Sequence, residues 1–255
     1  MQKRTIGIIP ARYGSTRFEG KPLAIIWKKS MIQRVYERAS KATKLERVVV
    51  ATDDDRIFQH VLDFGGECVM TSVDCMNGTE RCAEVLAKLT ETYDFVVNIQ
   101  GDEPFIYPEQ IDAVVEVLEQ NEGFEVATLV RRIKSIEELN NTSVVKAVLA
   151  FTNKALYFSR QAIPFVRGVA AKNVLKHNTF YKHIGLYGYK AAVLPKLARL
   201  EATNLEKLES LEQLRWLENG ISIGISETKY DTVGVDMPID LIKAIELAKR
   251  LDYIK

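Results

Sequence analysis

The amino-acid sequence predicts an α/β fold in which helices cover both faces of a mainly parallel sheet. Through the first 130 residues, short apolar runs alternate with amphipathic helical patterns, and strand–helix–strand repeats of this kind build parallel sheets. The runs are apolar at nearly every position, which is typical of strands buried on both faces. In such a sheet, ligands bind beyond the carboxyl ends of the strands.

The elements of this first part follow one another in a regular order. The expected strands cover residues 5–9, 47–52, 67–71, 95–100 and 125–130. Ser30 and Gln33 have the spacing of a capping box before a helix at 31–42. A second helix, at 55–64, precedes Gly65, which can close a helix in the left-handed conformation.

From about residue 144 the pattern becomes less regular. Strands are expected at 144–151, 155–160 and 183–189, and a helical run at 204–220, before a last helix that begins near Pro238. Leucines 205, 208, 211 and 214, together with Trp216, could be buried core or could face a partner subunit. We therefore expect one domain over 1–255, with roughly 150–220 as an excursion from the main sheet.

Charge and composition limit the possible partners. The 35 Lys and Arg residues nearly balance the 34 Asp and Glu residues, for a formal net charge of +1. No broad basic field is available for nucleic acid or an anionic membrane. No apolar run reaches the roughly 18–20 residues of a membrane-spanning helix, and the N-terminal apolar stretch is too short for a signal peptide. We expect a cytoplasmic protein whose three cysteines are free thiols.

The loop after the first strand has the composition of a triphosphate site. The stretch IIPARYGSTRFEGKPL carries Arg12, Arg17 and Lys21 among glycines and hydroxyl residues. Backbone N–H groups, hydroxyls and cations are the groups that bind phosphate oxygens. The stretch matches neither the GxxxxGK[ST] loop nor the GxGxxG fingerprint. A solvated basic turn is the alternative reading.

Residues 10–23, PARYGSTRFEGKPL, resemble the N-terminal signature of 3-deoxy-manno-octulosonate (Kdo) cytidylyltransferases, which is close to PARYxSTRxPGKPL. Further segments resemble the same family in order, including VATDD, VVNIQGDEP, HIGLYGY, LESLEQLRWLENG and VGVDMPIDL. Glu19 stands where the family usually has proline. Cys75 and Asn77 stand where it more often has histidine and serine.

The resemblance implies a nucleotidyltransferase-type α/β fold with an α+β insertion for sugar binding and dimerisation. It also implies the reaction of CTP with Kdo to give CMP-Kdo and pyrophosphate for lipopolysaccharide synthesis, catalysed by a homodimer. Lys21, Asp102 and Asp236 are the expected catalytic residues. Asp102 and Asp236 are the expected ligands of Mg²⁺, which prefers one or two carboxylates plus phosphate oxygens. Helix capping is the alternative role for Asp236.

The family pattern also implies two sets of binding residues. The CTP-binding set is Ala11, Arg12, Ser15, Lys21, Arg81 and Gln100. The set for a 2-keto-3-deoxy sugar acid is Arg160, His183, Tyr187, Glu212 and Gln213, each of which could instead have a purely structural role. Two alternatives to Kdo activation stay open: activation of 8-amino-Kdo or a nonulosonic acid, and a non-catalytic nucleotide-binding relative.

Overall fold

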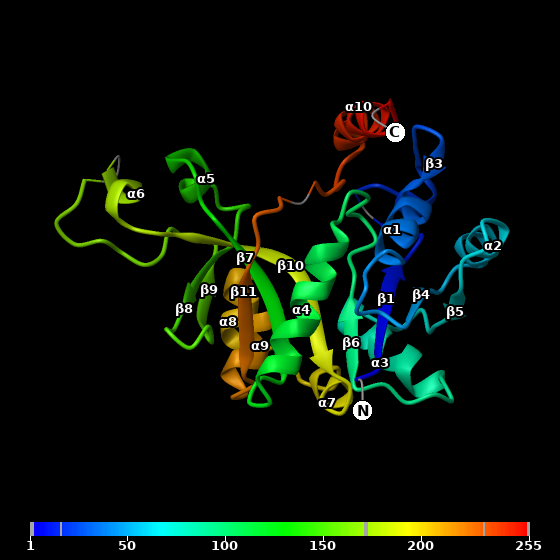
Figure 1. Cartoon of the computed structure of the whole chain (residues 1–255), viewed down its shortest axis with the longest axis horizontal. Helices are drawn as coiled ribbons and strands as arrows, with labels where there is room; N and C mark the ends of the chain where they lie inside the picture. The colour runs from blue at the N-terminus through cyan, green and yellow to red at the C-terminus, as the bar shows by residue number, and fades with distance from the viewer. Residues whose placement is uncertain (1–2, 16, 171–172, 232, 254–255) are drawn as a thin grey trace. The chain divides into compact units, whose positions relative to one another are not determined.

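The computed structural model describes residues 3–15, 17–170, 173–231 and 233–253, and it forms two compact units (Figure 1). The first unit comprises the described residues up to Asp112 and those from Val233 onward. The second unit is Ala113–Asp231. The excursion expected at residues 150–220 lies within the second unit.

The first unit contains a fully parallel sheet, as the apolar runs predict. Its strand order is β6 (Phe95–Asn98), β1 (Thr5–Ala11), β4 (Arg47–Thr52) and β5 (Cys68–Met70). Ile8 and Ile9 are both fully buried in β1. Neighbouring residues of a strand point to opposite faces, so the sheet is covered on both.

The helices of this sheet begin at side-chain caps. They are α1 (Met31–Ala39), α2 (Asp55–Asp63) and α3 (Gly78–Lys88). Ser30 caps α1 as predicted, with its Oγ accepting from the Gln33 backbone N–H. The Gln33 side chain, however, donates to Glu37. Gly65 follows α2 with φ +80°, which confirms the predicted left-handed turn.

A small apolar cluster joins the C-terminal helix to the region after β1. This region holds the 3₁₀ turn η1 (Lys21–Leu23) and the short strands β2 (Ile25–Ile26) and β3 (Lys29–Ser30). The helix α10 (Pro238–Tyr253) places Ala244 and Ala248 against Ile26 and Phe105, with Phe18 packed beside them. The loop and the C-terminal segment thereby share one core.

The second unit is a mixed sheet. Strand β7 (Val126–Arg132) pairs parallel with β11 (Ile223–Glu227) and antiparallel with β10 (Tyr181–Lys190). Strands β8 (Lys146–Leu149) and β9 (Ala155–Ser159) form a hairpin, and β8 also pairs with β10. The short helices are α5 (Ile136–Asn140), α6 (Val174–His177) and α7 (Leu194–Leu197), whereas α4 (Pro108–Gln120) runs across the boundary between the units.

The helical run expected at 204–220 is two short helices, α8 (Asn204–Glu209) and α9 (Gln213–Glu218). Ser210 between them adopts a left-handed conformation with φ +52°. Leucines three residues apart drift around a helix of 3.6 residues per turn, so one straight helix cannot bury them all. Leu211, Leu214 and Trp216 are buried core, whereas Leu208 is 72% exposed.

Within the described ranges, no helix combines the length and the apolar composition that crossing a bilayer requires.

Candidate functional site

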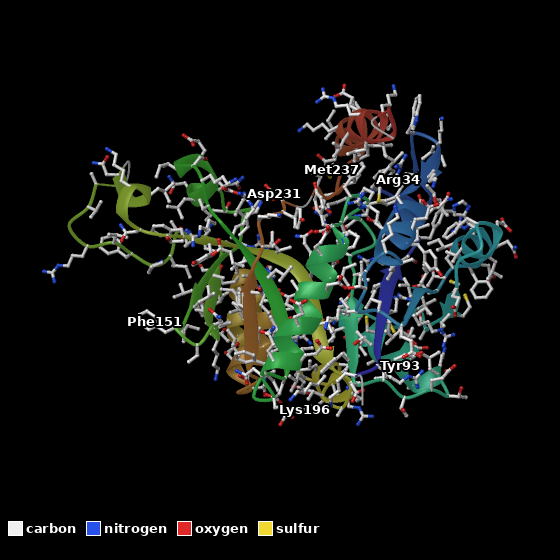
Figure 2. The ribbon with its side chains drawn as sticks, viewed as in Figure 1. Arg34, Tyr93, Phe151, Lys196, Asp231 and Met237 are labelled. Atoms are coloured by element: carbon white, nitrogen blue, oxygen red, sulfur yellow. The ribbon has the colours of Figure 1, made fainter. Side chains whose placement is uncertain are left out.

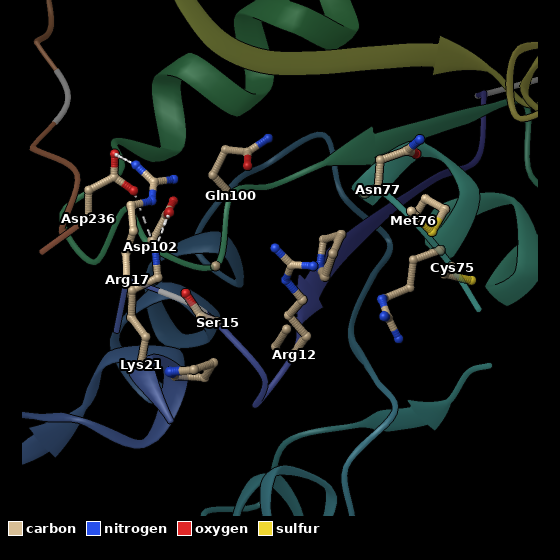
Figure 3. A pocket seen from close by; sticks show the side chains of 16 residues that line it. Arg12, Ser15, Arg17, Lys21, Cys75, Met76, Asn77, Gln100, Asp102 and Asp236 are labelled. Atoms are coloured by element: carbon tan, nitrogen blue, oxygen red, sulfur yellow. Dashed lines mark hydrogen bonds and ion pairs between the residues drawn. The ribbon is translucent and has the colours of Figure 1, made fainter. Parts of the chain in front are cut away.

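One open pocket of about 260 Å³ is lined by the loop after β1, the turn after β6, the start of α3 and the segment before α10 (Figure 3). It lies in the first unit, where the parallel strands bring their carboxyl ends to one edge. The lining includes every residue predicted for CTP or metal: Ala11, Arg12, Ser15, Lys21, Arg81, Gln100, Asp102 and Asp236. Thr16 of the same loop lies outside the described residues.

Gly101 lets the turn after β6 lie directly against the end of β1. A Cβ atom at this position would come within 2.7 Å of the Pro10 carbonyl oxygen. Because backbone cannot give way as a flexible side chain can, only glycine fits this approach. Gly101 therefore sets where Gln100 and Asp102 stand relative to β1.

Lys21 lies between the two predicted metal ligands. Its Nζ is 2.6 Å from Asp102 Oδ2 and 3.6 Å from Asp236 Oδ1. Arg17, which the site prediction leaves out, reaches Asp236 Oδ2 at 3.4 Å (Figure 3). In the sequence, the sign that Arg17 belongs to the site was its position in the loop between the cations Arg12 and Lys21. Two carboxylates thus converge on one cationic nitrogen.

The donor set fits Mg²⁺, which accepts one or two carboxylates and completes its shell with phosphate oxygens and water. Asp102 and Asp236 are the two carboxylates at this point of the pocket. In the described part of the chain, no group of three or more His, Cys, Asp or Glu side chains could hold a metal ion. Two carboxylates would leave the other coordination positions of an ion here to water or to a ligand such as a triphosphate.

Arg81 is held in place by a carboxylate that the site prediction missed. Its Nη2 lies 2.8 Å from Asp53 Oδ2, and its Nη1 donates to Thr71 Oγ1 at 2.5 Å. The Arg81 side chain is only 4% exposed. Asp53 follows β4 directly in VATDD, and an acid at a strand's carboxyl end was the signal that could have identified it.

The start of α3 forms another wall of the pocket. Asn77 Oδ1 accepts from the Glu80 backbone N–H at 2.9 Å and so caps the helix. Cys75 donates to Glu84 at 3.0 Å. Burial and the Glu84 carboxylate raise the pKa of the Cys75 thiol to about 11, so the thiol stays protonated at neutral pH. Cys68, Cys75 and Cys82 are free thiols, as predicted.

The five residues predicted for the sugar acid all belong to the second unit. His183 Nε2 and Thr128 Oγ1 share a hydrogen bond of 2.9 Å, and the His183 ring contacts the rings of Phe158 and Tyr187. Removal from water lowers the pKa of His183 to about 3. Burial, with Tyr189 and Glu212 nearby, raises the pKa of Tyr187 well above its usual range.

Arg160 forms hydrogen bonds within the second unit, and Gln213 is buried in it. The Arg160 guanidinium donates to the carbonyl oxygens of Thr142, Glu209 and Ser210. Gln213 is 4% exposed, and within the described residues its Nε2 has no hydrogen-bond partner. These contacts show structural roles, and the sugar-binding roles of all five residues stay predictions.

Comparison with known proteins gives one consistent family. The cytidylyltransferase family pattern matches residues 6–223. The 3-deoxy-manno-octulosonate cytidylyltransferase of Parabacteroides distasonis is 50% identical over 244 residues, which cover 94% of this chain and 96% of that protein. The protein of the same name from Porphyromonas gingivalis is 49% identical and covered over 96% of each chain.

A solved structure agrees with these relatives. CMP:2-keto-3-deoxy-manno-octonic acid synthetase in complex with CTP is 40% identical and matches with a TM-score of 0.90, over 97% of this chain and 99% of that one. This agreement confirms the predicted nucleotidyltransferase-type α/β fold. By sequence and by fold, the chain belongs to the 3-deoxy-manno-octulosonate cytidylyltransferases.

Proposed function

We propose that this protein is the enzyme that joins CMP from CTP to Kdo, giving CMP-Kdo and pyrophosphate for lipopolysaccharide synthesis. The observation that carries the proposal is the convergence of Lys21 with Asp102 and Asp236 in one pocket. The family relationship supports the same reaction. We place the enzyme in the cytoplasm, where CTP is available.

The reaction is an in-line displacement at phosphorus. The anomeric hydroxyl of the sugar acid gives up its proton to water as its oxygen forms a bond to the α-phosphorus of CTP, the bond from that phosphorus to the bridging oxygen breaks, and pyrophosphate leaves. Positioning and charge neutralisation dominate such transfers. Lys21 and Arg12 neutralise phosphate oxygens. Asp102 and Asp236 would hold Mg²⁺, which supplies positive charge at the phosphate oxygens when bound.

The base and the sugar acid are recognised by different groups. Arg81, fixed by Asp53, offers N–H donors to the cytosine carbonyl, and the Gln100 amide can donate as well as accept. For the sugar acid we propose Arg160, His183, Tyr187, Glu212 and Gln213. A carboxylate and several hydroxyls require one cation and several polar partners, which this set provides.

The test measures pyrophosphate release with CTP and Mg²⁺, offering Kdo, 8-amino-Kdo and N-acetylneuraminic acid in parallel, with mass spectrometry of the product. We expect turnover with Kdo and a product of CMP-sugar mass. Turnover with only one of the other acids would show that this acid, and not Kdo, is the substrate. CTP binding without turnover on any of the three would favour the non-catalytic alternative.

Asp236→Asn tests the predicted metal ligand. We expect most of the turnover to disappear while the circular dichroism spectrum is retained, because the exchange removes a negative charge without changing shape. Asp55→Asn, at an exposed position of α2 outside the pocket, is the matched control. An unchanged rate of the Asp236 variant in Mg²⁺ would contradict the assignment.

A further inference from the structure

The loop between β1 and η1 is closed on itself by Tyr13 and Gly20. The Gly20 backbone N–H donates to the Tyr13 carbonyl at 2.9 Å. Gly20 has φ +66°, and a Cβ atom there would lie 3.1 Å from Cε2, Cζ and Oη of Tyr13. The Tyr13 ring therefore packs against the last residue before Lys21.

A cation from another element stacks on the same ring. The guanidinium carbon of Arg56, at the start of α2, lies 3.3 Å from the centroid of the Tyr13 ring. Arg56 is not among the described residues that line the pocket. It therefore contacts the loop from outside the nucleotide site.

Arg56 is itself paired with Asp54. Its Nε and Nη2 donate to the two oxygens of Asp54 at 3.0 and 2.7 Å, and Asp54 also caps α2 through the Arg56 backbone N–H. A bidentate pair of this kind fixes the plane of the guanidinium. Asp54 balances the charge of Arg56. Arg56 therefore acts through its contact with the loop more than through attraction of the CTP phosphates.

Glu19 belongs to the same charge cluster. The pKa of Arg56 is raised first by its hydrogen bond to Asp54, and the Glu19 carboxylate contributes in the same direction. The carboxylate that stands in place of the usual proline thus adds negative charge near Arg56.

We propose that Arg56 is a positioning residue of the CTP site, which holds Tyr13 and thereby the loop that presents Arg12, Ser15 and Lys21. The inference rests on the proposed function, since it takes CTP as the ligand. A loop ordered before binding loses less conformational entropy when the nucleotide enters. Loss of the stacking therefore weakens CTP binding and leaves the chemical step unchanged.

The test is calorimetric titration of CTP with Mg²⁺ into the wild-type chain, Arg56→Gln and Lys41→Gln. Lys41 is an exposed cation outside the pocket and serves as the matched control for charge. We expect the Kd for CTP to rise about two- to fivefold in Arg56→Gln, the size of one exposed cation–π contact. The KM for CTP should rise equally, with kcat and the KM for the sugar acid unchanged.

A double-mutant cycle separates positioning from general destabilisation. Tyr13→Leu, which leaves α2 and its cap intact, should weaken CTP binding at least as much, and Arg56→Gln should add nothing to it. Tyr13→Phe retains the ring and should bind as the wild type does. Wild-type affinity in Arg56→Gln, or additive effects of the two changes, would overturn the proposal. Absence of CTP binding in the wild type would instead overturn the proposed function.

Discussion

At the scale of single residues, four charged groups of the pocket compensate one another. Lys21, with its side chain only 16% exposed, stands between Asp102 and Asp236, and Arg17 pairs with Asp236 from the other side. Two cations and two carboxylates balance, so none of the four is left as an uncompensated charge. A triphosphate that enters must therefore compete with these carboxylates for Lys21.

Lys21→Gln tests this competition. We expect turnover to fall about 100-fold, the typical effect of removing one group that stabilises developing charge. Mg²⁺ titrated in the absence of nucleotide should bind more tightly to the variant, because the ammonium no longer neutralises the two carboxylates. Lys28→Gln, outside the pocket lining, is the control. Weaker Mg²⁺ binding by the Lys21 variant would show that the Lys21 ammonium and Mg²⁺ do not compete for the two carboxylates.

His183 makes stability depend on pH. Its pKa is about 3 in the folded chain and 6.5 in its ordinary state. Between these values the unfolded chain binds a proton that the folded chain does not, so stability is greatest above pH 6.5 and falls as the pH decreases toward 3. Urea unfolding at pH 7 and pH 5.5 should show His183→Gln losing less stability than the wild type, by on the order of 1 kcal/mol. Equal losses would contradict this.

At the residue scale, sequence motifs could predict that the cations and acids of the pocket lie in one cluster of loops. They could not predict which cation pairs with which acid. Asp53 was missed because an acid after a strand is equally common in turns. Only the folded chain shows its oxygen 2.8 Å from Arg81. Likewise, the sequence marks Glu19 as unusual, whereas its relation to Arg56 depends on how α2 approaches the loop.

At the scale of elements, apolar runs predicted the strands because buried parallel strands are apolar on both faces. Strand β11 was not expected. The break between α8 and α9 was also missed. It depends on Ser210 in a left-handed conformation, which glycine normally signals. Elements defined by tertiary contacts escape local patterns.

The cap of α3 explains one departure from the family signature. Asn77 accepts the Glu80 backbone N–H, and serine at this position could accept it as well. Asn77→Ser should therefore leave stability nearly unchanged, whereas Asn77→Ala should cost about 1 kcal/mol. Thermal unfolding of the three chains checks this, with the alanine variant about 2–4 °C lower. Equal melting temperatures for all three would show that the cap contributes nothing.

At the scale of the whole molecule, the β8–β9 hairpin of the second unit presents apolar side chains at the surface. Phe151, at the tip of the β8–β9 hairpin, is fully exposed (Figure 2), and Leu156 is 56% exposed. Leu149, Ala150 and Tyr181 lie with them around a hollow of about 550 Å³. Contiguous exposed apolar groups of this kind mark interaction surfaces in many proteins. The first unit, by contrast, holds the proposed nucleotide site.

We expect the enzyme to be a homodimer in which this hairpin is covered by the second copy. Light scattering after gel filtration, at micromolar concentration, should give twice the mass of the chain for the wild type. Phe151→Asp should give the mass of a single chain, because burial of a carboxylate in an apolar contact is unfavourable. Val73→Asp, at a 75% exposed apolar residue of the first unit, is the matched control and should remain dimeric. A wild-type monomer would refute the dimer, and a dimeric Phe151 variant would move the interface elsewhere. Since CTP binds within the first unit in our proposal, a monomeric variant should retain the wild-type affinity for CTP.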